Sequence, residues 1–182
     1  IILQLRIVVP SEHGMAVIYL GRSAYNFHRR EVMKGYKLST SSAWSEDQVR
    51  DYLDTTVLPC RLASIDQNGF PQVTSMWFLQ KNKFIYLSAR SKSLICSRLK
   101  RNNKVGFEIA GENPPYSGVR GRGTATLINA VSEPVLEKLI EKYLISTDSS
   151  LAKWLLSHPQ SESTIKIVPE WMTSWDYSSR MD

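Results

Sequence analysis

The sequence has few of the residues that build metal centres or disulfide frameworks. Its 182 residues include only two cysteines, Cys60 and Cys96, which lie far apart and form neither a CxxC pair nor a zinc-binding pattern. The three histidines, His13, His28 and His158, are isolated from one another and from the cysteines. We therefore expect no metal site, and two small buried thiols in a reducing, cytoplasmic compartment.

Long hydrophobic runs and blocks of like charge are also missing. One of the longest apolar stretches, MAVIYL at residues 15–20, is far shorter than the roughly 20 residues that cross a membrane. The first ten residues lack the basic start and long apolar stretch of a signal peptide. The net charge of +6 permits an anionic partner, but the basic residues are spread along the chain, which argues against nucleic acid.

The pattern of apolar residues predicts a mainly β domain with peripheral helices. Residues 1–44 are expected to form an N-terminal extension, and residues 45–182 the folded domain. Ser45 and Gln48 form a capping-box pattern that opens a short helix. Short strands follow with mostly short connections, which favours a small antiparallel barrel over a parallel α/β sheet. The strands are expected at residues 58–65, 71–79, 84–88, 104–110, 119–128 and 163–171.

The segments between these strands predict how they are connected. The first three strands are expected to form an antiparallel meander, with Gly69 supplying a positive φ in the DQNG turn. A helix capped by Ser91 is expected after the third strand. The glycines of VRGRGTATLI predict a close approach of backbones or a bend at a barrel corner. Two further helices are expected at residues 132–144 and 150–158.

The stretch YLSARSKSL, residues 86–94, places hydroxyls and cations together at the start of a helix. A helix start normally favours acids, because its exposed N–H groups carry partial positive charge. Together with those N–H groups, the side chains would form a receptor for a phosphate group. The residues alone leave a second interpretation open, in which the serines cap the helix and the cations are solvated. The side chains concerned are Ser88, Arg90, Ser91, Lys92 and Ser93.

Several motifs between residues 55 and 180 follow one another in a specific order. They are Leu62-Ala63-Ser64, the turn from Asp66 to Pro71, Trp77-Phe78, Ile85-Tyr86-Leu87-Ser88, Lys92, Asn102-Asn103-Lys104-Val105, the strand VRGRGTATLI and a tail that bears Trp175. Their order and spacing resemble those of the pyridoxamine 5′-phosphate oxidase-like superfamily of FMN-binding split barrels. The resemblance implies a six-stranded antiparallel split β-barrel with Greek-key character. The loop before Lys92 is one residue shorter than in that family.

The resemblance also implies a homodimer that binds FMN in a cleft between subunits and acts on a small organic substrate. The residues beside the flavin ring would be Val73, Thr74, Ser75, Met76 and Trp77. The residues holding the phosphate would be Ser88, Arg90, Ser91 and Lys92. Trp175 would approach the ring from the partner subunit. No catalytic side chain is assigned, because the hydride chemistry belongs to the flavin.

Two alternatives stay open on the same scaffold. One is a reductase that uses the deazaflavin coenzyme F420, and the other is a non-catalytic protein that binds flavin or haem. Pyridoxamine phosphate itself is not assigned as the substrate, because Arg180 follows Trp175 at a spacing that differs from the tail of that enzyme. The basic N-terminal segment also permits an accessory role in binding nucleic acid or a partner.

Overall fold

The computed structural model describes residues 6–11, 14–19, 35–130, 132, 134–144 and 148–181. The chain divides into two compact units, Ile1–Gly35 and Tyr36–Asp182. In the first unit, strands β1 (Arg6–Ser11) and β2 (Gly14–Tyr19) pair antiparallel. Much of the extension expected over residues 1–44 lies outside the described residues.

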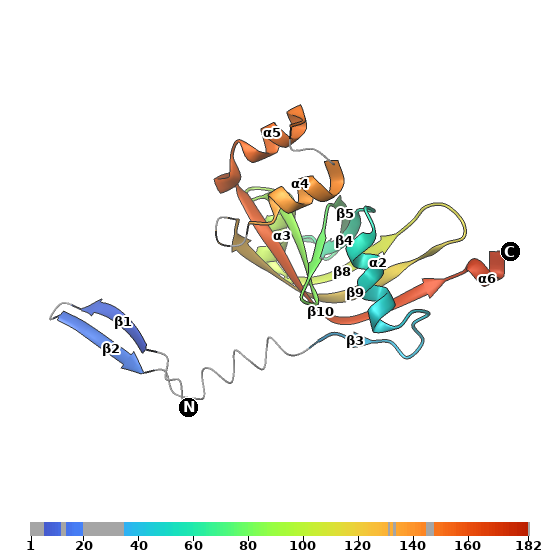
Figure 1. Ribbon diagram of the computed structural model, residues 1–182, viewed down its shortest axis with the longest axis horizontal. Helices are drawn as coiled ribbons and strands as arrows, with labels where there is room; N and C mark the ends of the chain where they lie inside the picture. Colours follow the sequence, from blue (N-terminus) through green and yellow to red (C-terminus); the bar gives the residue numbers. More distant parts are fainter. Residues whose placement is uncertain are drawn as a thin grey trace. The chain divides into compact units, whose positions relative to one another are not determined.

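The second unit is built around one sheet, which has eight strands among the described residues (Figure 1). Its strands are β3 (Lys37–Leu38), β4 (Cys60–Ile65), β5 (Pro71–Met76), β6 (Leu79–Lys81), β7 (Phe84–Arg90), β8 (Lys104–Ala110), β9 (Ser117–Asn129) and β10 (Glu162–Asp176). The helices are α2 (Glu46–Thr55), α3 (Leu94–Arg101), α4 (Leu136–Leu144), α5 (Ser150–Leu156), the 3-10 turn η1 (Pro159–Ser161) and α6 (Ser178–Met181). This mainly β fold with peripheral helices confirms the predicted class.

The sheet is open, and its two edge strands are neighbours in the chain. Its strand order is β5-β4-β8-β9-β10-β7-β6, with β3 added in parallel to β10. Only Trp77 and Phe78 separate the end of β5 from the start of β6. The barrel is therefore split between two strands that the chain joins directly, and no ladder of hydrogen bonds closes it.

The predicted meander is confirmed in its two antiparallel pairings, but its second strand is interrupted, so the three strands do not form one continuous ribbon. β4 pairs with β5, but β7 pairs with β6 and β10 and does not pair with β5. The single strand predicted over residues 71–79 is two strands, β5 and β6. Asn82 and Lys83, both with positive φ, form the tight turn of the β6–β7 hairpin. Alternation and turn residues thus indicate where strands lie, but not where a strand is interrupted.

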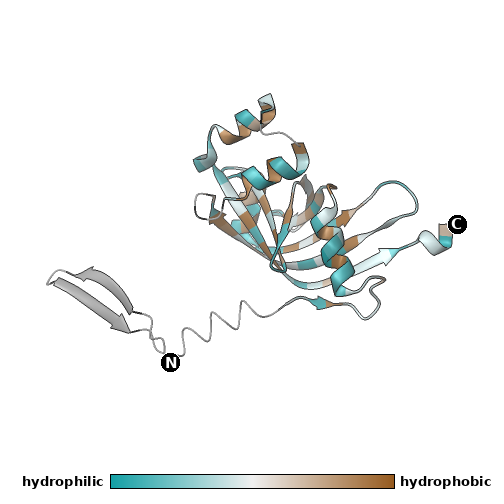
Figure 2. Ribbon diagram, in the orientation of Figure 1, coloured by the Kyte–Doolittle hydropathy of each residue, from teal (hydrophilic) through white to brown (hydrophobic). Residues whose placement is uncertain are grey.

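The core of this unit is a cluster of apolar side chains from the sheet and from α2 and α3. Figure 2 shows hydrophobic residues interspersed with hydrophilic ones along these strands and helices. The largest fully buried side chains include Leu53, Leu62, Phe78, Ile85, Leu87, Ile109, Ile165, Ile167 and Met172. The core lies against the strands that carry the site residues, so it fixes their positions.

Helix α2 begins as the sequence predicts. The Ser45 hydroxyl accepts a hydrogen bond from the Gln48 N–H at 3.3 Å, and the Gln48 side chain accepts one from the Ser45 N–H at 2.9 Å. The Gly69 φ of 87° confirms the predicted turn between β4 and β5. None of the helices in the described ranges is long and apolar enough to span a bilayer.

The glycines of β9 confirm the predicted close approach of backbones. A Cβ atom on Gly121 would lie 2.5 Å from the Phe107 ring and 2.6 Å from the Trp171 carbonyl oxygen. A Cβ atom on Gly123 would overlap the Val168 carbonyl group. The register between β9 and β10 shifts beside this point, so the chain bends where it has no room for side chains.

Candidate functional site

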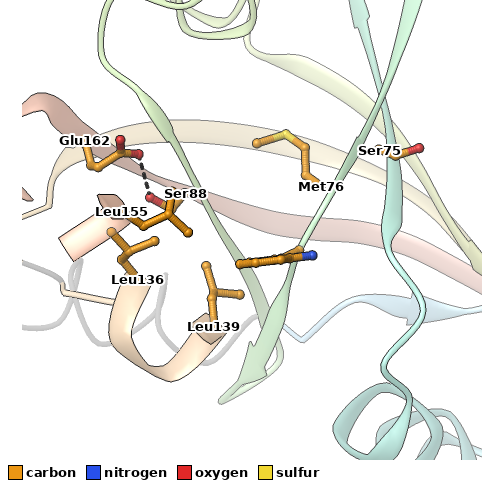
Figure 3. Close-up of a pocket in the computed structure, with 8 residues that line it drawn as sticks. Ser75, Met76, Ser88, Leu136, Leu139, Leu155 and Glu162 are labelled. Carbon is orange, nitrogen blue, oxygen red and sulfur yellow. Dashed lines mark hydrogen bonds between the residues drawn. The ribbon is translucent and has the colours of Figure 1, made fainter. Parts of the chain in front are cut away.

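A cavity of about 300 Å³ lies between the end of β5, β7, the start of β10 and helices α4 and α5. Figure 1 shows α4 and α5 together at one end of the sheet, and Figure 3 shows leucines of these helices beside Ser88 and Glu162. This volume is at the lower end of the range for small-molecule sites. The lining residues are Ser75, Met76, Trp77, Ser88, Leu136, Leu139, Leu155 and Glu162. Four of the ten predicted site residues are therefore brought together.

The polar part of this cavity is centred on a buried carboxylate. The side chain of Glu162 is 5% exposed. Its Oε2 atom accepts a hydrogen bond of 3.1 Å from the Ser88 hydroxyl, drawn in Figure 3, and its Oε1 atom lies 2.9 Å from the Arg90 Nε atom. The pairing of β7 with β10 places Glu162 directly opposite Arg90. The donors of Ser88 and Arg90 therefore converge on one anion.

Arg90 is held from two further directions. Its Nη1 atom donates a hydrogen bond of 2.8 Å to the Ser161 hydroxyl. Its guanidinium lies 4.8 Å from the ring centroid of Trp154 in α5, a cation–π contact. The orientation of Arg90 is thus fixed by η1, β10 and α5 together.

Ser91 and Lys92 are not part of this convergence. The Ser91 hydroxyl lies 2.8 Å from the Ser163 hydroxyl, and the Ser91 N–H donates to the Ser161 carbonyl oxygen at 2.8 Å. Lys92 is exposed, and its side chain forms no hydrogen bond or ion pair within the described part of the chain. Of the four predicted phosphate residues, two share a carboxylate, one is tied to β10 and one faces solvent.

The predicted cap of the following helix is also corrected. The N-cap of α3 is Ser93, whose hydroxyl accepts from the Cys96 N–H at 3.4 Å, and Ser91 has no capping role. The reason is that β7 continues to Arg90, two residues beyond the predicted strand end. The chain therefore reaches the helix later than the pattern of serines indicated.

Strand β5 carries the residues predicted beside a ring. Among the described strands it pairs with β4 alone, so the backbone groups of its other edge have no partner in this sheet. The Val73 side chain is 65% exposed and Ser75 is also exposed, whereas Thr74 and Met76 are half-buried. This edge therefore offers both backbone hydrogen-bonding groups and small side chains to a ligand.

Trp77 is fixed by an aromatic neighbour in α4. Its ring stacks on Tyr143, with centroids 5.2 Å apart and planes 10° apart. The Tyr143 hydroxyl accepts from the Phe78 N–H at 3.2 Å and donates to the Leu58 carbonyl oxygen at 3.0 Å. Burial raises the pKa of Tyr143 to about 12, so its phenol stays protonated at neutral pH. Tyr143 thus ties the connection between β5 and β6 to the segment before β4, beside the cavity.

Trp175 lies in a different cavity, of about 360 Å³. Its lining residues are Ser41, Ala43, Arg120, Trp171, Thr173, Ser174, Trp175, Asp176, Tyr177 and Arg180, none of which lines the first cavity. Glu162 and Trp175 are thirteen positions apart on β10, on the order of 40 Å of strand. One chain therefore does not bring Trp175 to the cavity beside Ser88.

The charged side chains of this second cavity differ in whether they have a partner of the opposite charge or a hydrogen-bond partner. The Arg120 guanidinium lies 5.5 Å from the Trp175 ring centroid, but neither Arg120 nor Arg180 forms an ion pair with a carboxylate of the described residues. Hydrogen bonds from the Ser178 side chain, its backbone N–H and the Trp44 indole lower the pKa of Asp176. Two guanidinium groups are thus available to an anion.

Sequence reasoning missed Glu162 and the three leucines that line the first cavity. Glu162 lies one residue before the predicted strand 163–171, and its partner Ser88 is 74 positions away. An acid directly before an alternating apolar strand is a signal that a polar partner is needed, but it does not identify that partner. Within the described ranges, no group of three or more His, Cys, Asp or Glu side chains is placed to hold a metal ion.

Solved structures share this fold. The conserved hypothetical protein Rv2991 from Mycobacterium tuberculosis is 24% identical, with a TM-score of 0.62 over 78% of this chain and 90% of that one. An F420 reductase is 19% identical, with a TM-score of 0.57 over 68% and 94% of the two chains. HutZ, the haem storage protein from Vibrio cholerae, is 14% identical, with a TM-score of 0.56 over 72% and 93%.

Comparison with curated proteins finds no match. The family model described as pyridoxamine 5′-phosphate oxidase matches residues 45–176, which is most of the chain. This match spans strands β4 to β10 and the α2 helix before them, and it leaves out only β3 among the strands of this sheet. The resemblance of the motifs is thereby confirmed, and this chain belongs to the pyridoxamine 5′-phosphate oxidase family.

Proposed function

We propose that this protein binds FMN and acts as an oxidoreductase on a small organic substrate in a reducing, cytoplasmic compartment. The observation that carries this proposal is the convergence of the Ser88 and Arg90 donors on one anion beside an apolar, indole-lined cavity. The proposal is supported by the membership of the family and by the likeness of the fold to that of an F420 reductase.

The apolar part of the cavity suits a planar aromatic ring. Leu136, Leu139 and Leu155 line it together with Trp77, whose ring is held by its stack on Tyr143. The open edge of β5, with Val73, Thr74, Ser75 and Met76, offers N–H and C=O groups to the polar rim of such a ring. In the proposed complex the isoalloxazine ring lies along this strand.

The polar corner has the chemistry of an anion receptor. A hydroxyl and a guanidinium already bind a carboxylate there, so the same donors suit a phosphate group. Ser91 and Lys92 follow directly in the chain, and Lys92 would add positive charge at the surface of the corner. Bound FMN would supply hydride transfer, while the chain supplies binding, orientation and exclusion of water.

The proposed site needs two copies of the chain. Trp175 lines a cavity separate from the one beside Ser88, so a contact of both with one flavin requires a homodimer. Arg120 would accompany Trp175, because its guanidinium lies over that ring. The partner subunit would thus contribute an indole and unpaired positive charge.

A deazaflavin is the second candidate cofactor. The unpaired guanidinium groups of Arg120 and Arg180 would suit the acidic tail of F420, and one structure with this fold is an F420 reductase. This alternative predicts weak binding of FMN and tighter binding of F420.

An absorbance spectrum and ligand titrations of the purified full chain test the proposal. We expect flavin bands, one FMN per chain, and a dimer by light scattering. Lys92→Ala should weaken FMN binding several-fold without lowering the melting temperature, because the exposed side chain contributes only charge at the phosphate corner. Lys100→Ala, which removes an exposed lysine from α3, is the matched control and should bind FMN as the wild type does.

Four results would contradict parts of the proposal. A colourless chain that takes up F420 and not FMN would favour the deazaflavin, and a Soret band would point to haem. Equal FMN affinity of Lys92→Ala and Lys100→Ala would remove Lys92 from the site. A monomer that binds FMN would remove the partner role of Trp175.

A further inference from the structure

Glu162 occupies the donors that a phosphate would need. Its two carboxylate oxygens are both engaged, one by Arg90 and the other by Ser88. A phosphate bound to the same donors would lie against this carboxylate, and two anions at that distance repel each other strongly in a buried site. The corner therefore holds one anion at a time.

We propose that Glu162 is a specificity-determining residue that competes from within the chain for this anion site. A ligand phosphate binds to Ser88 and Arg90 only in exchange for the Glu162 carboxylate. For FMN as the ligand this inference rests on the proposed function, but the competition itself applies to any phosphate.

The exposure of the Arg90 and Glu162 side chains sets the direction of the exchange. Arg90 is 40% exposed on its side chain, so an anion can approach it from solvent, whereas Glu162 is 5% exposed. Glu162 is the first residue of β10 and directly follows η1, so its side chain can leave if the strand end shifts. Breaking a buried ion pair is unfavourable, and the phosphate must offset that loss before it gains affinity.

The local charge makes the competition selective. Arg90 and Glu162 neutralise each other, and Lys92 faces solvent outside their contact. With Glu162 in place the corner attracts no further anion, and with Glu162 neutralised Arg90 has no counter-ion. The affinity for a flavin without a phosphate would not be affected, because such a flavin has no phosphate to bind to Ser88 and Arg90.

The variant Glu162→Gln tests the exchange, because it removes the charge and keeps the size and an acceptor oxygen. Flavin fluorescence titrations compare FMN with riboflavin, which lacks the phosphate. We expect Glu162→Gln to bind FMN at least tenfold more tightly than the wild type does, with riboflavin affinity changed by less than twofold. Glu170→Gln, an exposed site on the same strand, is the charge-matched control and should match the wild type.

An unchanged or weaker FMN affinity in a folded Glu162→Gln protein would overturn the proposal. A second readout does not depend on flavin: inorganic phosphate is titrated while the indole N–H signal of Trp154, the ring stacked on Arg90, is followed by NMR. The signal is assigned with Trp154→Phe. We expect it to shift in Glu162→Gln at phosphate concentrations at least tenfold below those needed in the wild type.

The two readouts separate the two proposals. If neither protein binds a flavin, the proposed function fails, while the phosphate titration still decides the role of Glu162. Equal phosphate responses of the two proteins would show that Glu162 only stabilises the fold. If Glu162→Gln does not fold, Glu162→Ala in acetate buffer replaces it: acetate should then compete with phosphate, and an absence of competition would overturn the proposal.

Discussion

Gly123 of β9 lies directly against the backbone of β10. A Cβ atom there would meet the backbone of Val168 and Pro169, which cannot rotate away as a side chain could. Gly106 on the neighbouring strand β8 differs, because its nearest atom to an added Cβ is the Ala63 methyl group at 3.8 Å. A side chain is therefore excluded at Gly123 by the neighbouring backbone, whereas at Gly106 there is room for a methyl group.

We expect Gly123→Ala to destabilise the fold by about 1–3 kcal/mol, because the methyl group forces two backbones apart. Gly106→Ala should change the free energy of unfolding by less than about 1 kcal/mol. Urea denaturation of both variants measures the difference. Equal stability of the two variants would mean that β9 and β10 can separate at this point without loss.

The site residues show how much of a binding site can be predicted from single positions of the sequence. Ser88 and Arg90 were predicted as donors to a ligand phosphate from their place before a helix, which stays a prediction, and in the structure they contact the Glu162 carboxylate. The identity of that anion was not predictable, because Glu162 reaches the corner through strand pairing across 74 positions. A sequence pattern thus indicates the chemistry of a donor more readily than its partner.

The elements were predicted more closely than their pairing. Strand β8 has the predicted bounds, and Ser45 caps α2 as expected. The β5–β6 break at Trp77 and Phe78 was not foreseen, because both residues continue the apolar pattern of a strand. The split of the barrel depends on the curvature of the whole sheet, which no local pattern encodes.

Helix α4 ties the connection between β5 and β6 to the segment before β4 through one side chain. The Tyr143 hydroxyl bonds to the Phe78 N–H and to the Leu58 carbonyl oxygen. We expect Tyr143→Phe to lower the free energy of unfolding by about 1–3 kcal/mol, because it leaves the Phe78 N–H without its partner. Chemical denaturation checks this value.

The exposed Tyr116 offers the control, since Tyr116→Phe should leave stability unchanged within about 0.5 kcal/mol. The Tyr143→Phe variant should also make the surroundings of the Trp77 ring less uniform, because that ring stacks on residue 143. A variant as stable as Tyr116→Phe would show that water replaces the hydroxyl at no cost.

The whole second unit should lose stability at alkaline pH. Burial raises the pKa of the Cys60 thiol to about 12 from 9.0, and burial is also the main cause that raises the pKa values of Tyr36 and Tyr143 to about 12 from 10.0. The folded state therefore keeps protons that the unfolded chain releases. This contribution is fully present below pH 9 and is lost as the pH rises towards 12.

Guanidinium unfolding at pH 8, 10 and 11.5 measures this loss. Cys60 is fully buried and should contribute a fall of up to about 1.4 kcal/mol per pH unit above pH 9. Cys60→Ala should reduce the loss of unfolding free energy between pH 9 and 10. An unfolding midpoint that stays constant from pH 8 to 11.5 would contradict the burial of these groups.

The burial of both cysteines has a practical consequence for labelling. Cys60 and Cys96 have no exposed surface, and the sequence contains no other thiol. A maleimide dye added to the native protein would therefore find no accessible thiol. One cysteine engineered on an exposed strand or helix would carry the dye at a known position, and energy transfer between donor- and acceptor-labelled copies would then report their association directly.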